Sequence, residues 1–207
     1  CVLLQMTLVA FSDIIQIARE WNSDGLLKSF VLSNIHGLSP NFINGVKTVD
    51  YEETKQLYLH ILDAYEKHQD WVVLKIFLDE CLAYWKDRPI IDAGQSVPMA
   101  TCMPINSKIY IDSQMQIGIC EKVADKYRIG NVKNGIDWKR ANEIVEEYYH
   151  KRVERCKYCP AIRMCDMCLT AVEYSDEQWD ILCHNERVYA QIFMFLYCEM
   201  AERGLIK

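Results

Sequence analysis

The apolar residues of this chain change their spacing several times, and each spacing predicts a different element. Residues 2–10 are nearly all apolar and rich in β-formers, which is typical of a strand buried on both faces of a parallel sheet. A helical pattern follows to about Trp21 and can be capped by Ser12 or Asp13. A second apolar strand is predicted at residues 27–35. A strand, a helix and a strand within about 35 residues indicate a βαβ unit.

The next strong helical pattern begins at Asp50. Glu53 lies three residues later, so the two residues form a capping box. Residues 71–78 are predicted as a third strand, and residues 80–85 as a short helix or turn. The buried stripe of the helix that Asp50 begins is predicted at Leu57, Ile61, Leu62 and Tyr65.

The pattern changes after residues 86–106, where prolines and glycines crowd together and predict a domain boundary. Residues 108–120 alternate in polarity, and the polar segment 112–114 separates two apolar arms, which predicts a hairpin. A turn is predicted at residues 130–135. The apolar positions of the two arms are Ile109 and Ile111, then Ile117 and Ile119.

Two amphipathic helices complete the pattern. The first is capped by Asp137 and runs to about Val153. The last covers residues 185–203 and ends at Gly204, a suitable residue for the position after a helix. The inward residues of the first helix are predicted to be Trp138, Ala141, Ile144, Val145 and Tyr148.

Taken together, these elements predict an α+β protein with two domains, at residues 1–90 and 91–207. The chain has 207 residues, of which 51% are apolar and 25% charged, as in soluble globular proteins. Its net charge of -6 does not favour nucleic-acid binding. The first apolar run is too short to cross a bilayer, and no basic region typical of a signal peptide precedes it. We therefore expect no membrane association and no export.

The ten cysteines are clumped rather than spread along the chain. Four of them lie between Cys156 and Cys168, too close together for each to form an unstrained disulfide. A chain of this length also does not need disulfides to fold. Clumped thiols in a reducing compartment usually hold a metal, so we expect a cytoplasmic metalloprotein.

Seven of the cysteines form one pattern. A C-x2-C turn places two thiolates a few ångströms apart, which suits a zinc ion or an iron–sulfur cluster. The short five-residue spacer between the two C-x2-C pairs favours an iron–sulfur cluster, which is larger than a zinc ion. A zinc site remains the alternative. Cys81 and Cys198 lie outside the pattern and are predicted to be small buried apolar residues. The pattern consists of Cys102, Cys120, Cys156, Cys159, Cys165, Cys168 and Cys183.

The cysteine-flanked hairpin, the helix, the run C-x2-C-x5-C-x2-C and the final Cys183 resemble the SPASM domain. This is the C-terminal auxiliary-cluster domain of a subset of radical S-adenosylmethionine (SAM) enzymes. Residues 120–123 and 129–132 are similar to segments of peptide maturases that install thioether crosslinks. The family's last spacing, C-x3-C, is C-x2-C here. The resemblance is strong over residues 95–200 and weaker over residues 1–90.

The resemblance implies a fold and a set of ligands. Residues 1–90 would be the last β/α units of a partial (β/α)6 barrel, followed by a small SPASM domain of a hairpin and helices. Leu32 and Ser33, at the end of a barrel strand, would contact SAM. One [4Fe–4S] cluster would be held by Cys102, Cys120 and Cys168, and a second by Cys156, Cys159, Cys165 and Cys183.

The basic residues around the C-x2-C run admit two interpretations. They offset the negative charge of a thiolate-ligated cluster, or they belong to a solvated face. They are Arg155, Lys157 and Arg163.

The resemblance also implies a function. The chain would be the auxiliary-cluster part of a radical SAM peptide maturase, with a cysteine-containing precursor peptide as substrate and a flavodoxin or ferredoxin as electron donor. The chain has no C-x3-C-x2-C motif for a catalytic cluster, so we expect it to be inactive alone and part of a larger enzyme. An anaerobic sulfatase-maturase-like enzyme and a structural zinc-binding interaction module are the alternatives.

Overall fold

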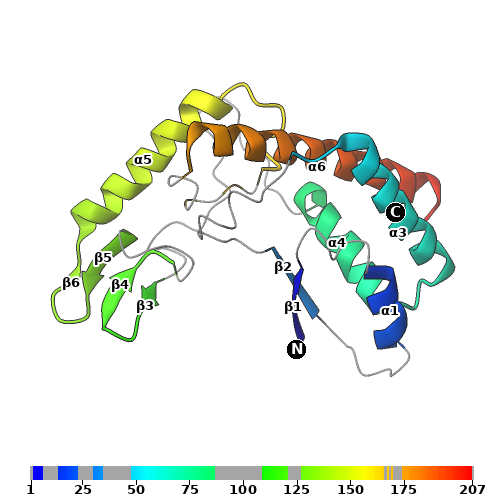
Figure 1. The fold of residues 1–207 in the computed structure, drawn as a ribbon, viewed down its shortest axis with the longest axis horizontal. Coiled ribbons are helices and arrows are strands. Elements are labelled where there is room, and N and C mark those ends of the chain that lie inside the picture. The colour runs from blue at the N-terminus through cyan, green and yellow to red at the C-terminus, as the bar shows by residue number, and fades with distance from the viewer. Residues whose placement is uncertain are drawn as a thin grey trace. The chain divides into compact units, whose positions relative to one another are not determined.

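The computed structural model describes residues 2–6, 14–22, 30–34, 48–86, 109–120, 127–165, 167, 169 and 174–206. These residues form an α+β protein, as the sequence predicts (Figure 1). The chain divides into two compact units, and helix α6 contributes to both, with the change at Val188. The two domains predicted at residues 1–90 and 91–207 stay a prediction.

The first unit contains the predicted βαβ segment. Strand β1 (Val2–Met6) and strand β2 (Phe30–Asn34) pair in parallel, with Leu4 opposite Leu32, and helix α1 (Ile14–Asn22) lies between them in the sequence. Figure 1 shows the two strands side by side. The remaining residues of the two predicted strands, 7–10, 27–29 and 35, lie outside the described residues. The partial barrel suggested by the family resemblance stays a prediction.

Helix α3 (Tyr51–Lys67) begins where the capping box predicts. The Asp50 side chain accepts a hydrogen bond from the backbone N–H of Glu53 at 2.8 Å, which satisfies one of the free donors at the helix start. The stripe centred on Ile61 and Leu62 is fully buried, while Leu57 and Tyr65 are partly buried against the same core.

The prediction of a strand at residues 71–78 is wrong. These residues belong to helix α4 (Val72–Lys86), which also includes the predicted short helix at residues 80–85. The helix buries Leu74, Leu78 and Leu82 on one face, at helical spacing. On the opposite side the ammonium of Lys75 pairs with Asp79, four residues on. Burial of this face against neighbouring helices overrides the β-forming character of the segment.

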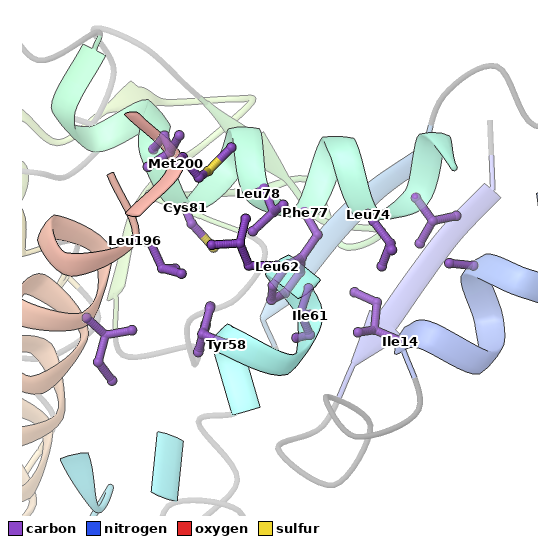
Figure 2. Close-up of a cluster of buried hydrophobic side chains, with 14 of the residues drawn as sticks. Ile14, Tyr58, Ile61, Leu62, Leu74, Phe77, Leu78, Cys81, Leu196 and Met200 are labelled. Carbon is purple, nitrogen blue, oxygen red and sulfur yellow. The ribbon is translucent and has the colours of Figure 1, made fainter. Parts of the chain in front are cut away.

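The core of the first unit gathers side chains from four helices (Figure 2). Ile14 of α1 and the buried faces of α3 and α4 meet apolar residues of the C-terminal part of α6. Those residues of α6 are Val188, Ile192, Leu196 and Met200. Their spacing of four residues places them on one helical face. At the end of the helix, the guanidinium of Arg203 binds Asp63 and Glu66 of α3 at 2.7 and 3.0 Å.

The second unit contains a four-stranded antiparallel sheet. The predicted hairpin is confirmed, with β3 (Tyr110–Ile111) paired to β4 (Gln116–Gly118). The predicted turn at residues 130–135 is confirmed at residues 132–134, where it joins β5 (Arg128–Asn131) to β6 (Gly135–Ile136) in a second hairpin. Gly130 has a φ of +145°, and a Cβ there would lie 2.2 Å from the carbonyl oxygen of Gly135, so only glycine fits.

Helix α5 (Trp138–Cys156) follows the sheet and is capped by Asp137, whose side chain accepts from the backbone N–H of Arg140 at 2.9 Å. Ala141, Ile144 and Tyr148 are buried as predicted, and Val145 is partly buried. The prediction that Trp138 points inward is wrong, because its side chain is 66% exposed. It occupies the first helical turn, before the buried stripe begins.

Helix α6 (Asp176–Glu202) begins nine residues before the predicted start at Asn185. Ser175 precedes the helix and caps it. Its backbone N–H donates to the Gln178 side chain, and its hydroxyl accepts from the backbone N–H of Gln178. The added turns bury Trp179 in the core of the second unit. The predicted stop is confirmed, because Gly204 has a φ of +69°. Among the described helices, none has a stretch long and apolar enough to cross a membrane.

Candidate metal centre

The C-x2-C pair lies at the C-terminal end of helix α5. Cys156 is the last residue of the helix, and the backbone N–H of Cys159 donates to the Cys156 carbonyl at 2.9 Å. This hydrogen bond closes a tight turn, so both cysteines lie at the C-terminal end of helix α5. The next residues continue in turns, with the Cys165 N–H donating to the Ala161 carbonyl at 2.9 Å. Cys156 and Cys165 are buried, and Cys159 is half-buried.

Cys183 comes from a different element. The sequence places it just before the last helix, and that prediction is wrong, because Cys183 lies within α6. It is half-buried, and it lies close enough to Cys156 and Cys159 that all three thiols interact electrostatically. Helix α6 therefore places a third thiol, 24 residues beyond Cys159, within electrostatic reach of the C-x2-C turn.

The ionisation of these thiols is controlled mainly by burial. Burial raises the pKa of Cys183 to about 11 and that of Cys165 to about 12, and it also raises the pKa of Cys156. Neighbouring thiols add to the effect for Cys156 and Cys183, because two adjacent thiolates repel each other. Without a metal, the thiols of Cys156, Cys165 and Cys183 are thus protonated near neutral pH. A metal or cluster that binds them must displace their protons.

Arginine side chains near the thiols act against burial, because their positive charge favours the thiolate form. Arg152, Arg155 and Arg187 each lower the pKa of Cys156. Arg152 was not among the residues that the sequence singled out, and it is completely buried in α5. The sequence contains a signal for its burial. Tyr148, Arg152 and Cys156 follow one another at spacings of four residues, so they share the buried face of the helix.

Arg152 lies against the cysteine cluster and the segment that follows it. Its Nη1 donates to the Cys165 Sγ at 3.8 Å, the Tyr148 hydroxyl at 3.2 Å and the Met167 carbonyl at 3.4 Å. Burial lowers the pKa of Arg152, but the interactions with Tyr148, Cys165 and Cys156 outweigh burial and raise this pKa above its usual value. The guanidinium is therefore charged.

The predicted basic residues have other partners as well. Arg155 forms ion pairs with Asp176 and Asp180 at 2.6 and 2.7 Å, which connect the end of α5 to the start of α6. Lys157 lies over the exposed ring of Tyr158, 5.0 Å from its centre. Arg155 thus braces the two helices that hold Cys156 and Cys183.

The remaining predicted site residues are Cys120, Cys102, Cys168, Leu32 and Ser33. Cys120 follows β4 and packs against the core of the second unit. Cys102 and Cys168 lie outside the described residues. Leu32 and Ser33 are in β2, opposite Leu4 and Gln5 of β1, near the C-terminal end of that strand. Only their backbone is described, so SAM contact stays a prediction.

Among the described residues, no three or more histidine, cysteine, aspartate or glutamate side chains form a group that could hold a metal ion. Cys156, Cys159, Cys165 and Cys183 are all described and do not form such a group, and the site that includes Cys102 and Cys168 stays a prediction.

Three cysteines lie outside the pattern, of which Cys1 is not among the described residues, and the other two differ from each other. Cys81 is buried beside Tyr58 in the first core, as predicted. Cys198 was also predicted to be buried, and this is wrong, because it is exposed on α6. Its neighbours Leu196 and Met200 occupy the buried face of the helix, which leaves position 198 on the other side.

Comparison with family models, with curated proteins and with solved structures gives no match for this chain.

Proposed function

We propose that this chain carries the auxiliary iron–sulfur clusters of a radical SAM enzyme that modifies a ribosomally made peptide. The proposal rests on the seven-cysteine pattern and its resemblance to the SPASM domain. Cys156, Cys159, Cys165 and Cys183 are the proposed ligands of one [4Fe–4S] cluster. Cys102, Cys120 and Cys168 belong to the other.

The observation that supports the proposal most directly is the electrostatic interaction of Cys183 with the C-x2-C pair Cys156 and Cys159. A helix end and a separate helix bring these three thiols within electrostatic reach of one another. Three thiols within this reach suit metal ligation, since cysteine thiolates hold iron–sulfur clusters.

The charges around the thiols also suit a cluster. A thiolate-ligated cluster is negatively charged, and Arg152, Arg155 and Arg187 all favour negative charge on Cys156. The ion pairs of Arg155 with Asp176 and Asp180 hold the two ligand-bearing helices together. These residues therefore provide a stable frame and partial charge compensation.

In the complete enzyme the clusters would supply electron transfer, or a binding point for the substrate. The residues of this chain would hold them at a fixed position and shield them from water. The proposed substrate is a cysteine-containing precursor peptide, and the proposed electron donor is a flavodoxin or a ferredoxin.

Single cysteine substitutions test the proposal. The chain is purified without oxygen, and visible absorption and bound iron are compared for the wild type, Cys159→Ala, Cys183→Ala and Cys198→Ala. Cys198 lies on the same helix as Cys183 but is exposed and outside the pattern, so it is the matched control. We expect Cys159→Ala and Cys183→Ala to lose about half of the iron, and Cys198→Ala to keep all of it. Equal iron in all four proteins, or none in any, contradicts the proposal.

A further inference from the structure

The two cysteines of the C-x2-C turn are placed for reaction with each other. The backbone N–H of Cys159 donates to the Cys156 carbonyl at 2.9 Å, and Lys157 between them has a φ of -55° and a ψ of -25°. A four-residue turn closed in this way keeps its first and last Cα atoms within about 7 Å of each other. A disulfide needs a Cα separation of about 4.4–6.8 Å, so the turn suits a disulfide between its ends. Both thiols are free in this structure.

The turn lies at the surface and gives its two thiols unequal access to solvent. Tyr158, between the two cysteines, is 87% exposed. Cys159 is half-buried, whereas Cys156 is buried, with 6% of its surface exposed. A reagent in solution therefore reaches the Cys159 sulfur first, and the Cys156 thiol is left to react with its neighbour.

The other described cysteines are less suited as partners of Cys159. Cys183 interacts electrostatically with the pair, but it belongs to helix α6, so its approach depends on how two helices pack. Cys165 is buried, and its sulfur already accepts a hydrogen bond. Cys81 and Cys198 belong to the first unit. The pair within the turn is thus the one that the backbone itself holds in place.

We propose that Cys156 and Cys159 form a reversible oxidation site, at which a small-molecule disulfide such as oxidised glutathione converts the two thiols into a disulfide. The Cys159 thiolate attacks one sulfur of the oxidant, forms a mixed disulfide with it and displaces one glutathione thiolate. The Cys156 thiolate then attacks the Cys159 sulfur and displaces the second glutathione thiolate. The chain loses two electrons and two protons, and the oxidant takes them up as two glutathione thiols.

This site goes beyond the proposed function, because its chemistry needs no bound metal. A disulfide and a metal exclude each other at this turn, since metal ligation requires the same two sulfurs as thiolates. Reduction restores the thiols from a disulfide, whereas oxidation to the sulfonic acid is irreversible. The disulfide therefore protects the C-x2-C turn while it holds no metal.

The experiment follows the disulfide in the metal-free chain. The chain is purified without oxygen, treated with a chelator, reduced, and exposed to mixtures of reduced and oxidised glutathione. The same exposure in urea is the reference for the unfolded chain. Free thiols are then blocked with N-ethylmaleimide, and the protein is digested with trypsin and analysed by mass spectrometry.

The sequence makes the digest diagnostic. Trypsin cleaves after Lys157, so the two cysteines fall in separate peptides, residues 156–157 and residues 158–163. Cys183 lies in a third peptide, residues 164–187, which also contains Cys165. A disulfide within the turn joins the first two peptides, and a disulfide to another cysteine of the run or of α6 joins one of them to the third.

We expect the two short peptides to be linked in the oxidised chain, and the linkage to be lost on treatment with dithiothreitol. The folded chain should form it at a lower concentration of oxidised glutathione than the chain in urea, because the turn holds the pair together. Cys156→Ser should instead carry glutathione on Cys159, and Cys159→Ser should leave the buried Cys156 unmodified. Cys198→Ser is the matched control, since Cys198 is exposed and outside the turn, and it should keep the linkage.

Several results would overturn the inference. They are linkage of either short peptide to residues 164–187, separate glutathione adducts on both cysteines, no oxidation of either, or linkage no easier in the folded chain than in urea. If Cys156→Ser does not fold, the wild type and Cys159→Ser decide in the same way. Iron analysis tests the proposed function separately. A chain that binds iron but forms no linkage overturns only this inference, and a chain that forms the linkage but binds no iron overturns only the proposed function.

Discussion

The guanidinium Nη2 of Arg128 lies 3.0 Å from the carboxylate Oδ2 of Asp112, so strand β5 is connected to the turn between β3 and β4. The other carboxylate oxygen of Asp112 accepts from the backbone N–H groups of Gln114 and Gln116, at 2.8 and 2.9 Å. Within this turn Met115 has a φ of 60°, which is costly for a residue other than glycine. Asp112 therefore organises the hairpin from within its turn.

The first prediction concerns this turn. In Asp112→Ala the N–H groups of Gln114 and Gln116 lose their acceptor, so their hydrogen exchange should accelerate. Ser113→Ala is the control, since Ser113 is exposed in the same turn, and it should leave both rates unchanged. Amide exchange followed by NMR measures the effect. Equal rates in Asp112→Ala and the wild type would show that the carboxylate does not hold the turn.

The second prediction concerns pH. Backbone hydrogen bonds, foremost that from Gln116, and the charge of Arg128 lower the pKa of Asp112 below its usual value of 3.8. The carboxyl of the unfolded chain is protonated first on acidification. The stability that Asp112 contributes is thus present above its unfolded pKa and is lost as the pH falls through the lower folded pKa.

Asp112→Asn provides the comparison, because its amide does not titrate. Urea unfolding between about pH 5 and about pH 3 should show the wild type losing its advantage over Asp112→Asn as the pH falls. A constant difference across this range would mean that the pKa of Asp112 is the same in the folded and unfolded chain.

The third prediction concerns thiol reactivity. Burial raises the pKa of the Cys81 thiol in the core beside Tyr58, whereas Cys198 is exposed. Iodoacetamide reacts with accessible thiolates, so it should modify Cys198 in the folded chain and Cys81 only after denaturation. Mass spectrometry of digested protein measures both sites, and Cys198→Ser should remove the fast reaction. Modification of Cys81 at the rate of Cys198 would contradict the burial of that core.

The fourth prediction concerns the start of helix α5, which carries Cys156 at its other end. In Asp137→Ala the backbone N–H of Arg140 loses its acceptor, and the free energy of unfolding should fall by about 1 kcal/mol. Asp137→Ser keeps a capping oxygen and should retain most of this free energy. Urea unfolding measures both variants. Equal losses in the two would show that capping is not what the side chain contributes.

The sequence predicts an element best where a local signal agrees with burial. The capping box of Asp50 and Glu53 and the polar turn at residues 112–114 both indicate their elements correctly. Residues 71–78 lack such a signal, and a short apolar run fits a strand or a buried helix equally well. Helix packing in the first core decides the outcome for α4, and that packing is not visible in local sequence.

The candidate site shows the same limit. The C-x2-C spacing indicates that Cys156 and Cys159 are neighbours, since a helix end and one turn fix their approach. The approach of Cys183 depends on where α6 begins, and the sequence places that start too late. Arg152 is missed because a charged residue on a predicted helix is assumed to be solvated, and only tertiary packing shows that it is buried.

The most direct test of the central claim is iron and acid-labile sulfide analysis of the chain purified without oxygen. Two [4Fe–4S] clusters predict about eight irons and about eight sulfides for each chain. About two zinc ions and no sulfide would contradict the claim, and would assign the cysteines to a structural zinc module.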